Sequence, residues 1–185
     1  MLACTSLFSY YFRHGRPTPD FTRAFLDFSR AKLLDQSWPR LRSTVESLTD
    51  EQVWWRPNEA SNSIGNLLLH LNGNVRQWLV SSFNQHADAR HRPVEFAERD
   101  HLPARTLLDR LGATLDEAAA VLTRLTADDL AATLNIQGYS VSGLEAIYHV
   151  VEHFSLHYGQ IVYITKMLRA EDLGFYKDLN ATGRA

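Results

Sequence analysis

The strongest constraint on the fold of this 185-residue chain is a helical repeat of apolar residues in four long stretches. Apolar positions recur every three or four residues over about residues 20–48, 61–83, 104–125 and 141–169. No stretch alternates apolar and polar residues strongly enough to demand a sheet, and only residues 133–136 suit a brief extended piece. Four such helices bury their apolar faces most economically against one another, so the sequence predicts an all-α four-helix bundle.

Local signals mark where these helices begin and break. Pro39 is expected to kink or split the first helix, because proline lacks the N–H that the helical hydrogen bond needs. Capping boxes predict two short turns, at Thr49 and Thr126, and the start of the last helix at Ser142. Residues 84–103 are polar and predict a long loop between the second and third helices, and such loops are often functional. We expect its three histidines to face solvent: His86, His91 and His101.

Composition and charge indicate one globular domain without a nucleic-acid partner. Hydrophobic residues make up 45% of the chain and charged residues 22%, which is ordinary for a globular protein. The net charge of -2 and the lack of a basic cluster argue against binding to DNA or RNA. We expect residues 1–18 to form a disordered extension and residues 19–185 to form a single four-helix-bundle domain.

The sequence also predicts a cytoplasmic protein with no membrane partner. No apolar run approaches the length of a membrane span. Residues 1–12 have no basic region and their apolar run is interrupted, so they make a poor signal peptide. The single Cys4 excludes an intramolecular disulfide and a cysteine-rich metal site, which fits a reducing compartment.

His153 and His157 lie four residues apart on the last predicted helix. Residues at this spacing share a helical face, so the two imidazoles project together and can offer two nitrogen ligands to one metal ion. His70, on the second predicted helix, would complete a three-histidine site with open coordination positions. Glu152 points about 100° away from the pair, so the site lacks the H-E-x-x-H signature of zinc proteases. The alternative is that these are core histidines hydrogen-bonded to each other and to Asn74.

Two segments together resemble the DinB-like superfamily of bacterial four-helix proteins, also called YfiT-like metal-dependent hydrolases. The first segment is Asn62–Asn74 and the second is Glu152–Tyr163. The flanking Leu48–Asn58 and Ile164–Lys166 look like an uncharacterised branch of that superfamily. The resemblance covers about residues 21–179, nearly the whole expected domain.

The resemblance implies that one histidine of the second helix and two of the fourth hold a divalent metal: His70, His153 and His157. It further implies zinc or nickel as the metal, water in the open coordination positions and a homodimer. Related proteins include thiol S-transferases that use bacillithiol, mycothiol or glutathione, and a mycothiol-dependent maleylpyruvate isomerase. A small-molecule substrate and a low-molecular-weight thiol are the partners that the resemblance implies here.

Other polar residues are candidates for supporting roles around the predicted ligands. His149 extends the histidine stripe but lies about 80° from the far ligand around the helix, so we expect it beside the ion, as a general base or a structural residue. Tyr158 is a second candidate for a catalytic donor. Ligating imidazoles usually donate their other N–H to a nearby acceptor, and the expected partners are Asn74 for His70 and Gln160 for His157. Glu145, four residues before His149, is the expected partner of that ring. Gln160 is equally suited to helix packing, and Glu145 also belongs to a capping box.

Two functions from different classes fit these features. The first is a metal-dependent enzyme of the thiol S-transferase or hydrolase type that uses the three-histidine centre. The second is a non-catalytic metal-binding or stress-response bundle, in which the ion stabilises the fold. A structural zinc site is usually closed by four protein ligands, so three histidines without a cysteine favour the enzyme. A binder of apolar ligands, the third possibility, predicts a large dry pocket and no metal.

Overall fold

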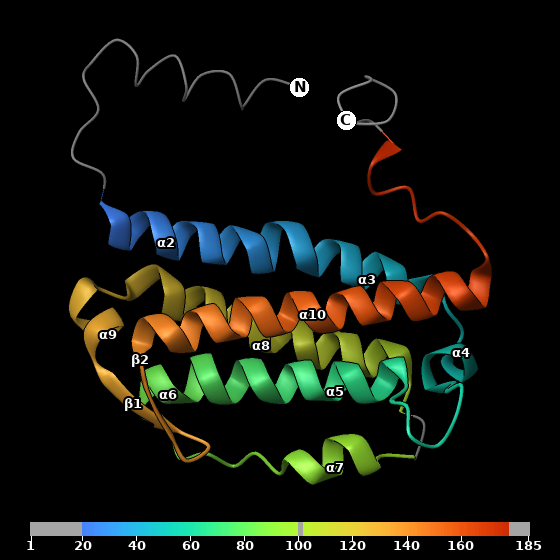
Figure 1. Cartoon of the computed structure of the whole chain (residues 1–185), viewed down its shortest axis with the longest axis horizontal. Coiled ribbons are helices and arrows are strands. Elements are labelled where there is room, and N and C mark those ends of the chain that lie inside the picture. The colour runs from blue at the N-terminus through green and yellow to red at the C-terminus, as the bar shows by residue number, and fades with distance from the viewer. Residues whose placement is uncertain (1–19, 100–101, 178–185) are drawn as a thin grey trace.

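The computed structural model describes residues 20–99 and 102–177, so the expected extension over residues 1–18 lies outside the described residues. Within these ranges, four helical rods lie side by side (Figure 1). The first rod joins three segments, the middle one a π-helix: α2 (Phe21–Arg30), η1 (Ala31–Ser37) and α3 (Trp38–Glu46). The second rod is built in the same way: α5 (Ile64–Val75), η2 (Arg76–Ser81) and α6 (Ser82–Asn84).

The other two rods are single α-helices, α8 (Ala104–Arg124) and α10 (Gly143–Arg169). The capping box predicted at Ser142 opens α10: Ser142 Oγ accepts a hydrogen bond from the Glu145 N–H at 3.2 Å, and Glu145 Oε2 accepts one from the Ser142 N–H at 2.7 Å. The predicted all-α four-helix bundle is therefore confirmed. In the part of the chain that the structure describes, no helix combines the length and apolar character needed to cross a membrane.

Pro39 interrupts the first rod without ending it. It lies in the first turn of α3, directly after the π-helix, where a missing N–H is tolerated. Two short helices follow the predicted capping boxes: α4 (Asp50–Trp54) and α9 (Ala127–Ala131). The local capping signals therefore identified these turns correctly.

A small hairpin accompanies the helices. Its strands are β1 (Thr133–Ile136) and β2 (Tyr139–Ser142), which pair antiparallel with Thr133 opposite Ser142. The turn between them consists of Gln137 and Gly138, whose φ angles of 54° and 82° are both left-handed, as a two-residue hairpin turn requires. The extended piece expected at residues 133–136 is thus one half of a sheet whose second strand the sequence pattern did not indicate.

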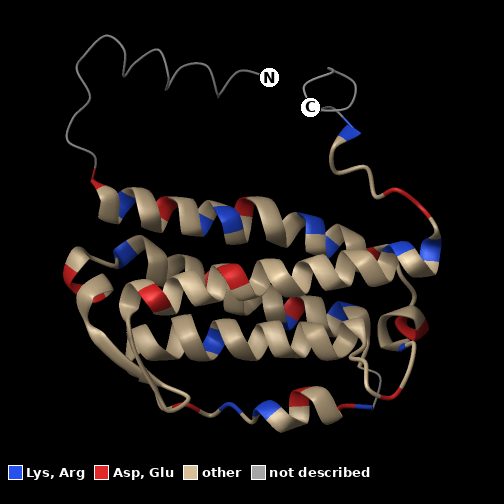
Figure 2. Ribbon diagram, in the orientation of Figure 1, with Lys and Arg blue, Asp and Glu red and all other residues tan. Residues whose placement is uncertain are grey.

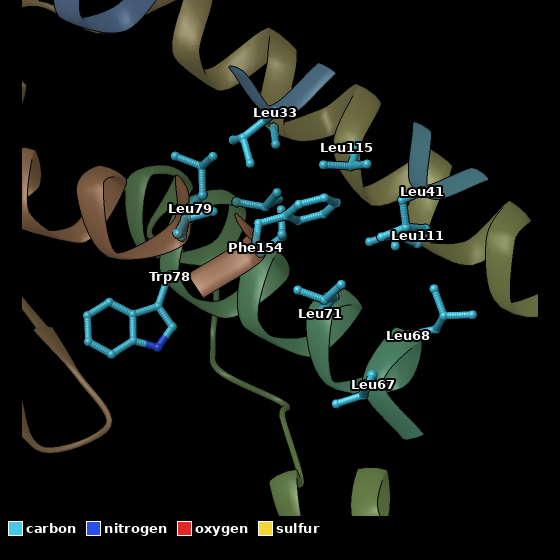
Figure 3. Close-up of a cluster of buried hydrophobic side chains, with 14 of the residues drawn as sticks. Leu33, Leu41, Leu67, Leu68, Leu71, Trp78, Leu79, Leu111, Leu115 and Phe154 are labelled. Atoms are coloured by element: carbon cyan, nitrogen blue, oxygen red, sulfur yellow. The ribbon is translucent and has the colours of Figure 1, made fainter. Parts of the chain in front are cut away.

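The core lies where the four rods meet, around Phe154 of α10. Its side chain is fully buried and points among leucines of the other three rods (Figure 3). Burying a phenylalanine stabilises a fold by about 3 kcal/mol relative to leaving it in water. The leucines that surround it are also buried: Leu33, Leu71, Leu79 and Leu115.

The segment between the second and third rods is not a loop throughout. It contains the short helix α7 (Arg92–Ala97), which lies along α5 (Figure 1). Consequently α5 is covered on three sides, by α8, α10 and α7. Polar residues of α5 are buried beneath α7 and α10, and they include His70.

Candidate metal centre

The three predicted ligands meet between α5 and α10. One nitrogen each from His70, His153 and His157 lies within 4.8 Å of the others. The Nε2 atoms of His70 and His153 are 2.9 Å apart, and the ring of His157 is 4.4 Å from that of His153 and 5.0 Å from that of His70. His70 is only 3% exposed, whereas the two histidines of α10 are partly exposed.

The surroundings keep the two imidazoles of α10 in the form that binds metals. Burial lowers the pKa of His153 from 6.5 to about 3, and the neighbouring imidazoles of His157 and His70 add to the shift. Burial likewise lowers the pKa of His157, although a hydrogen bond from its ring to Gln160 opposes the shift. A neutral imidazole has a free lone pair, which is the form that ligates metal ions.

The distances between the ligand nitrogens also suit a metal ion. Tetrahedral coordination at about 2.0–2.1 Å places two ligand nitrogens about 3.3 Å apart. The nitrogens of the cluster lie within 4.8 Å of one another and one pair is 2.9 Å apart, so side-chain rotations would bring all three to the distance that an ion requires. In the described residues the group contains three potential ligands and no fourth, which leaves coordination positions for exchangeable molecules.

Two ligand rings are oriented by hydrogen bonds at their Nδ1 atoms. Gln160 Oε1 lies 2.7 Å from Nδ1 of His157, as the three-residue spacing on one helix suggested. Glu95 Oε2 lies 2.8 Å from Nδ1 of His70. An N–H at Nδ1 leaves the lone pair at Nε2, so both rings present Nε2 to the cluster.

Glu95 was not among the residues singled out from the sequence. It belongs to α7, and its carboxylate also accepts hydrogen bonds from Arg90, at 2.7 Å from Nε and 2.9 Å from Nη2. Burial by itself raises the pKa of Glu95, but the hydrogen bonds and charges of Arg90 and His70 outweigh it, so the net pKa is lowered. The only signal in the sequence was the length of the loop, which does not say which charged residue turns inward.

Asn74 contacts a different histidine from the one expected. Its amide Nδ2 lies 3.1 Å from Nε2 of His149, and not against His70. The ring of His149 stacks on His153 at 5.1 Å and on Trp78 at 4.2 Å, so it adjoins the cluster without belonging to it. Asn74 Oδ1 and Trp78 Nε1 are buried without a hydrogen-bond partner among the described residues.

Among the described residues, the remaining candidates make no hydrogen bond or ring contact with the three imidazoles. Glu145 uses its carboxylate in the capping box with Ser142, and the described contacts show it in no other hydrogen bond. Tyr158 packs against Phe175 at 6.4 Å between ring centroids, and burial raises its pKa. Of the loop histidines, His86 and His91 are exposed as expected, whereas His101 lies outside the described residues.

An open groove lies along α5 and α10, and its lining includes none of the three histidines. It encloses about 500 Å³, and its apolar walls include Leu67, Leu156 and Tyr163. Gln160, which holds His157, is also part of its lining. A small molecule in this groove would therefore lie beside a residue that contacts a candidate metal ligand.

Comparisons with known proteins agree with this architecture. A family model described as "Protein of unknown function (DUF1572)" matches residues 20–177. No curated protein matches the sequence. Among solved structures, a conserved protein from Enterococcus faecalis superposes with a TM-score of 0.66 at 17% identity, covering 78% of this chain and 97% of that one. A DinB-like protein from Bacillus cereus ATCC 10987 superposes with a TM-score of 0.60 at 14% identity, covering 75% and 90%. At these identities the likeness shows the fold, and the expected DinB-like architecture is confirmed.

Proposed function

The chain belongs to the DUF1572 family, and from the geometry of its histidine cluster we propose that it binds a divalent metal and is a metal-dependent enzyme of the thiol S-transferase or hydrolase type. The observation that carries the proposal is the convergence of His70, His153 and His157 from two rods of the bundle. Zinc or nickel is the proposed metal, on the resemblance to DinB-like proteins. The thiol reaction rests on the same resemblance.

Two features support catalysis over a purely structural ion. The described residues supply three ligands, whereas structural zinc sites are usually closed by four. The groove lined by Gln160 and Tyr163 gives a small substrate a place next to Gln160, which is hydrogen-bonded to His157. A bound divalent ion would lower the pKa of a thiol or water that occupies an open position, which makes a nucleophile at neutral pH.

The side chains around the cluster have separable roles in this proposal. The three imidazoles bind the ion, and the hydrogen bonds of Gln160 and Glu95 orient two of them. His149, stacked on His153, is the proposed proton acceptor because burial lowers its pKa and keeps it neutral. Tyr158 packs with Phe175, and its part as a catalytic donor stays a prediction.

The first experiment is a measurement of metal content by elemental mass spectrometry on protein purified without an affinity tag. We expect about one zinc or nickel ion per chain in the wild type, and loss of that ion in His70→Ala and His157→Ala. His91→Ala is the matched control, since His91 is exposed and should leave the stoichiometry unchanged. Wild-type protein that stays metal-free after reconstitution would refute the proposed site.

A second experiment separates the enzyme from a non-catalytic metal-binding or stress-response bundle. Metal-loaded protein is incubated with low-molecular-weight thiols and electrophiles, and with ester and amide substrates, before and after chelation. Turnover that disappears on chelation and returns with the metal would support the enzyme. Stoichiometric metal without turnover of any of these compounds would favour the non-catalytic alternative.

A further inference from the structure

Side chains on one face of the second rod bind residues 90–98, the segment that contains α7. Asn66 Nδ2 donates to the backbone carbonyl oxygens of Glu95, at 2.9 Å, and Glu98, at 3.3 Å. Further along, Gln77 Oε1 accepts a hydrogen bond from Arg90 Nη1 at 2.9 Å. Between these two anchors lies His70, which contacts Glu95. The segment is thus fixed at both ends by amides and in the middle by a candidate metal ligand.

Gly73 allows the side chains of Glu95 and Arg90 to lie against the backbone of α5. A Cβ atom at this position would lie 2.1 Å from Glu95 Oε1 and 2.8 Å from Arg90 Nε. No side chain larger than hydrogen fits there while Glu95 and Arg90 keep their places. The glycine one turn beyond His70 therefore belongs to the site, although it has no functional group of its own.

The two charges that Gly73 accommodates are nearly inaccessible to water. The side chain of Arg90 is 5% exposed and that of Glu95 is 11% exposed. Burying an ion pair is costly unless each charge is compensated by further hydrogen bonds. Here the remaining hydrogen bonds go to His70 and Gln77. A buried pair is a poor means of stabilising a fold, but it fixes a carboxylate firmly against an imidazole.

The proton between Glu95 and His70 lies on the imidazole. Glu95 accepts two hydrogen bonds from Arg90, so it is the charged partner. A carboxylate oxygen 2.8 Å from Nδ1 then requires an N–H at that nitrogen. Arg90 Nη2 donates to Glu95 Oε2 at 2.9 Å; its contact with the same Nδ1 at 3.1 Å is then no hydrogen bond, because a protonated Nδ1 has no lone pair to accept one.

We propose that Glu95 is a positioning residue of the metal centre, which holds His70 as the Nδ1–H tautomer and aims its Nε2 lone pair at the two histidines of α10. Arg90 and Gly73 keep the carboxylate in place. The inference rests on the proposed function, because it concerns the affinity of the same three-histidine site. Hydrogen-bond partners of ligating histidines typically contribute 10–100-fold to metal affinity.

The affinity test compares three variants with the wild type by titration with Co²⁺ against a chromophoric chelator. In Glu95→Gln and in Gly73→Ala we expect the Kd to rise by about 10–100-fold. Glu152→Gln is the matched control. The Glu152 carboxylate carries the same charge near the histidines and acts to raise the pKa values of His149 and His157, but the described contacts show no hydrogen bond from it to them. The Kd of this variant should stay within about threefold of the wild type. Folding of each variant is checked by circular dichroism.

Two results would overturn the inference. One is binding within threefold of the wild type by folded Glu95→Gln and Gly73→Ala. The other comes from the metal-free wild type and needs no variant: nitrogen chemical shifts should show a protonated Nδ1 and an unprotonated Nε2 in His70, and the opposite tautomer contradicts the proposal. Failure of the wild type to bind Co²⁺ at all would instead refute the metal site itself.

Discussion

His153 is the residue whose proton affinity the fold changes most clearly. Its pKa falls from 6.5 to about 3, chiefly through burial. The unfolded chain therefore takes up a proton near pH 6.5, which the metal-free folded protein takes up only near pH 3. Between these values the unfolded state binds more protons, so the free energy of unfolding falls as the pH is lowered.

We expect metal-stripped protein to unfold at a lower urea concentration at pH 5 than at pH 7. In His153→Gln this loss should be smaller, because glutamine does not take up a proton in that range. Equal losses in wild type and variant would assign the pH dependence to other groups. His157, whose pKa is also lowered by burial, contributes in the same direction.

At the residue scale, sequence reasoning succeeded for local contacts and failed for distant ones. Gln160 lies three residues from His157 on one helix, so its contact follows from helical geometry alone. Glu95 lies 25 residues from His70 in sequence, and its contact depends on how α7 folds back. Asn74 is spaced correctly to reach the turn of His70, but its side chain is directed to α10 and meets His149.

At the scale of elements, one face of α10 packs in the core and another carries the histidines. Phe154 on one face is fully buried in the core, while its neighbour His153 turns toward α5. The metal centre is therefore placed by core packing. The predicted periodicity was sufficient to find α10 and the other rods, because each repeats its apolar positions over many turns. It was insufficient for α7, whose six residues span fewer than two turns.

Phe154→Ala should reduce the free energy of unfolding by about 3–5 kcal/mol, because truncation leaves a cavity among the surrounding leucines. The measurement is urea denaturation followed by circular dichroism. Phe28→Ala on α2 is the control: with 69% of the residue exposed, it should change stability by less than about 0.5 kcal/mol. A similar loss in both variants would mean that helix propensity, and not the core contact, determines the effect.

At the scale of the whole molecule, we predict that the homodimer implied by the resemblance forms through the outer surface of α10, so that the groove lined by Leu156 and Tyr163 would lie where the two subunits meet. This surface exposes large side chains that include Tyr148, 62% exposed, Leu156, 53%, and Tyr163, 67%. Charges are sparse along this helix (Figure 2). They are acidic near its start, at Glu145, and basic near its end, at Lys166.

This pattern is self-complementary when two α10 helices run antiparallel about a point between Ser155 and Leu156. Tyr148 then lies opposite Tyr163 of the partner subunit, and Glu145 lies opposite Lys166 of the partner subunit. Near the centre, Gly159 leaves open space above the helix, which permits close approach. A two-fold interface of this kind uses the same patch on both subunits.

The expected homodimer should scatter light as a particle of about twice 21.1 kDa. Tyr148→Asp combined with Leu156→Asp should yield a monomer, because it buries four like charges in the interface. Phe28→Asp provides the control, since Phe28 is 69% exposed but belongs to α2. Monomeric wild-type protein at micromolar concentration, or a dimer that survives the double variant, would contradict this interface.

The unequal burial of the three imidazoles sets the order in which an ion meets them. His153 and His157 reach the surface, whereas His70 is 3% exposed and tethered from behind by Glu95. If the cluster binds an ion, the pair on α10 would hold it first, and the rate of that step would grow with ion concentration. His70 would complete the coordination at a rate independent of concentration. The most deeply buried of the three histidines would then govern how long the ion stays bound.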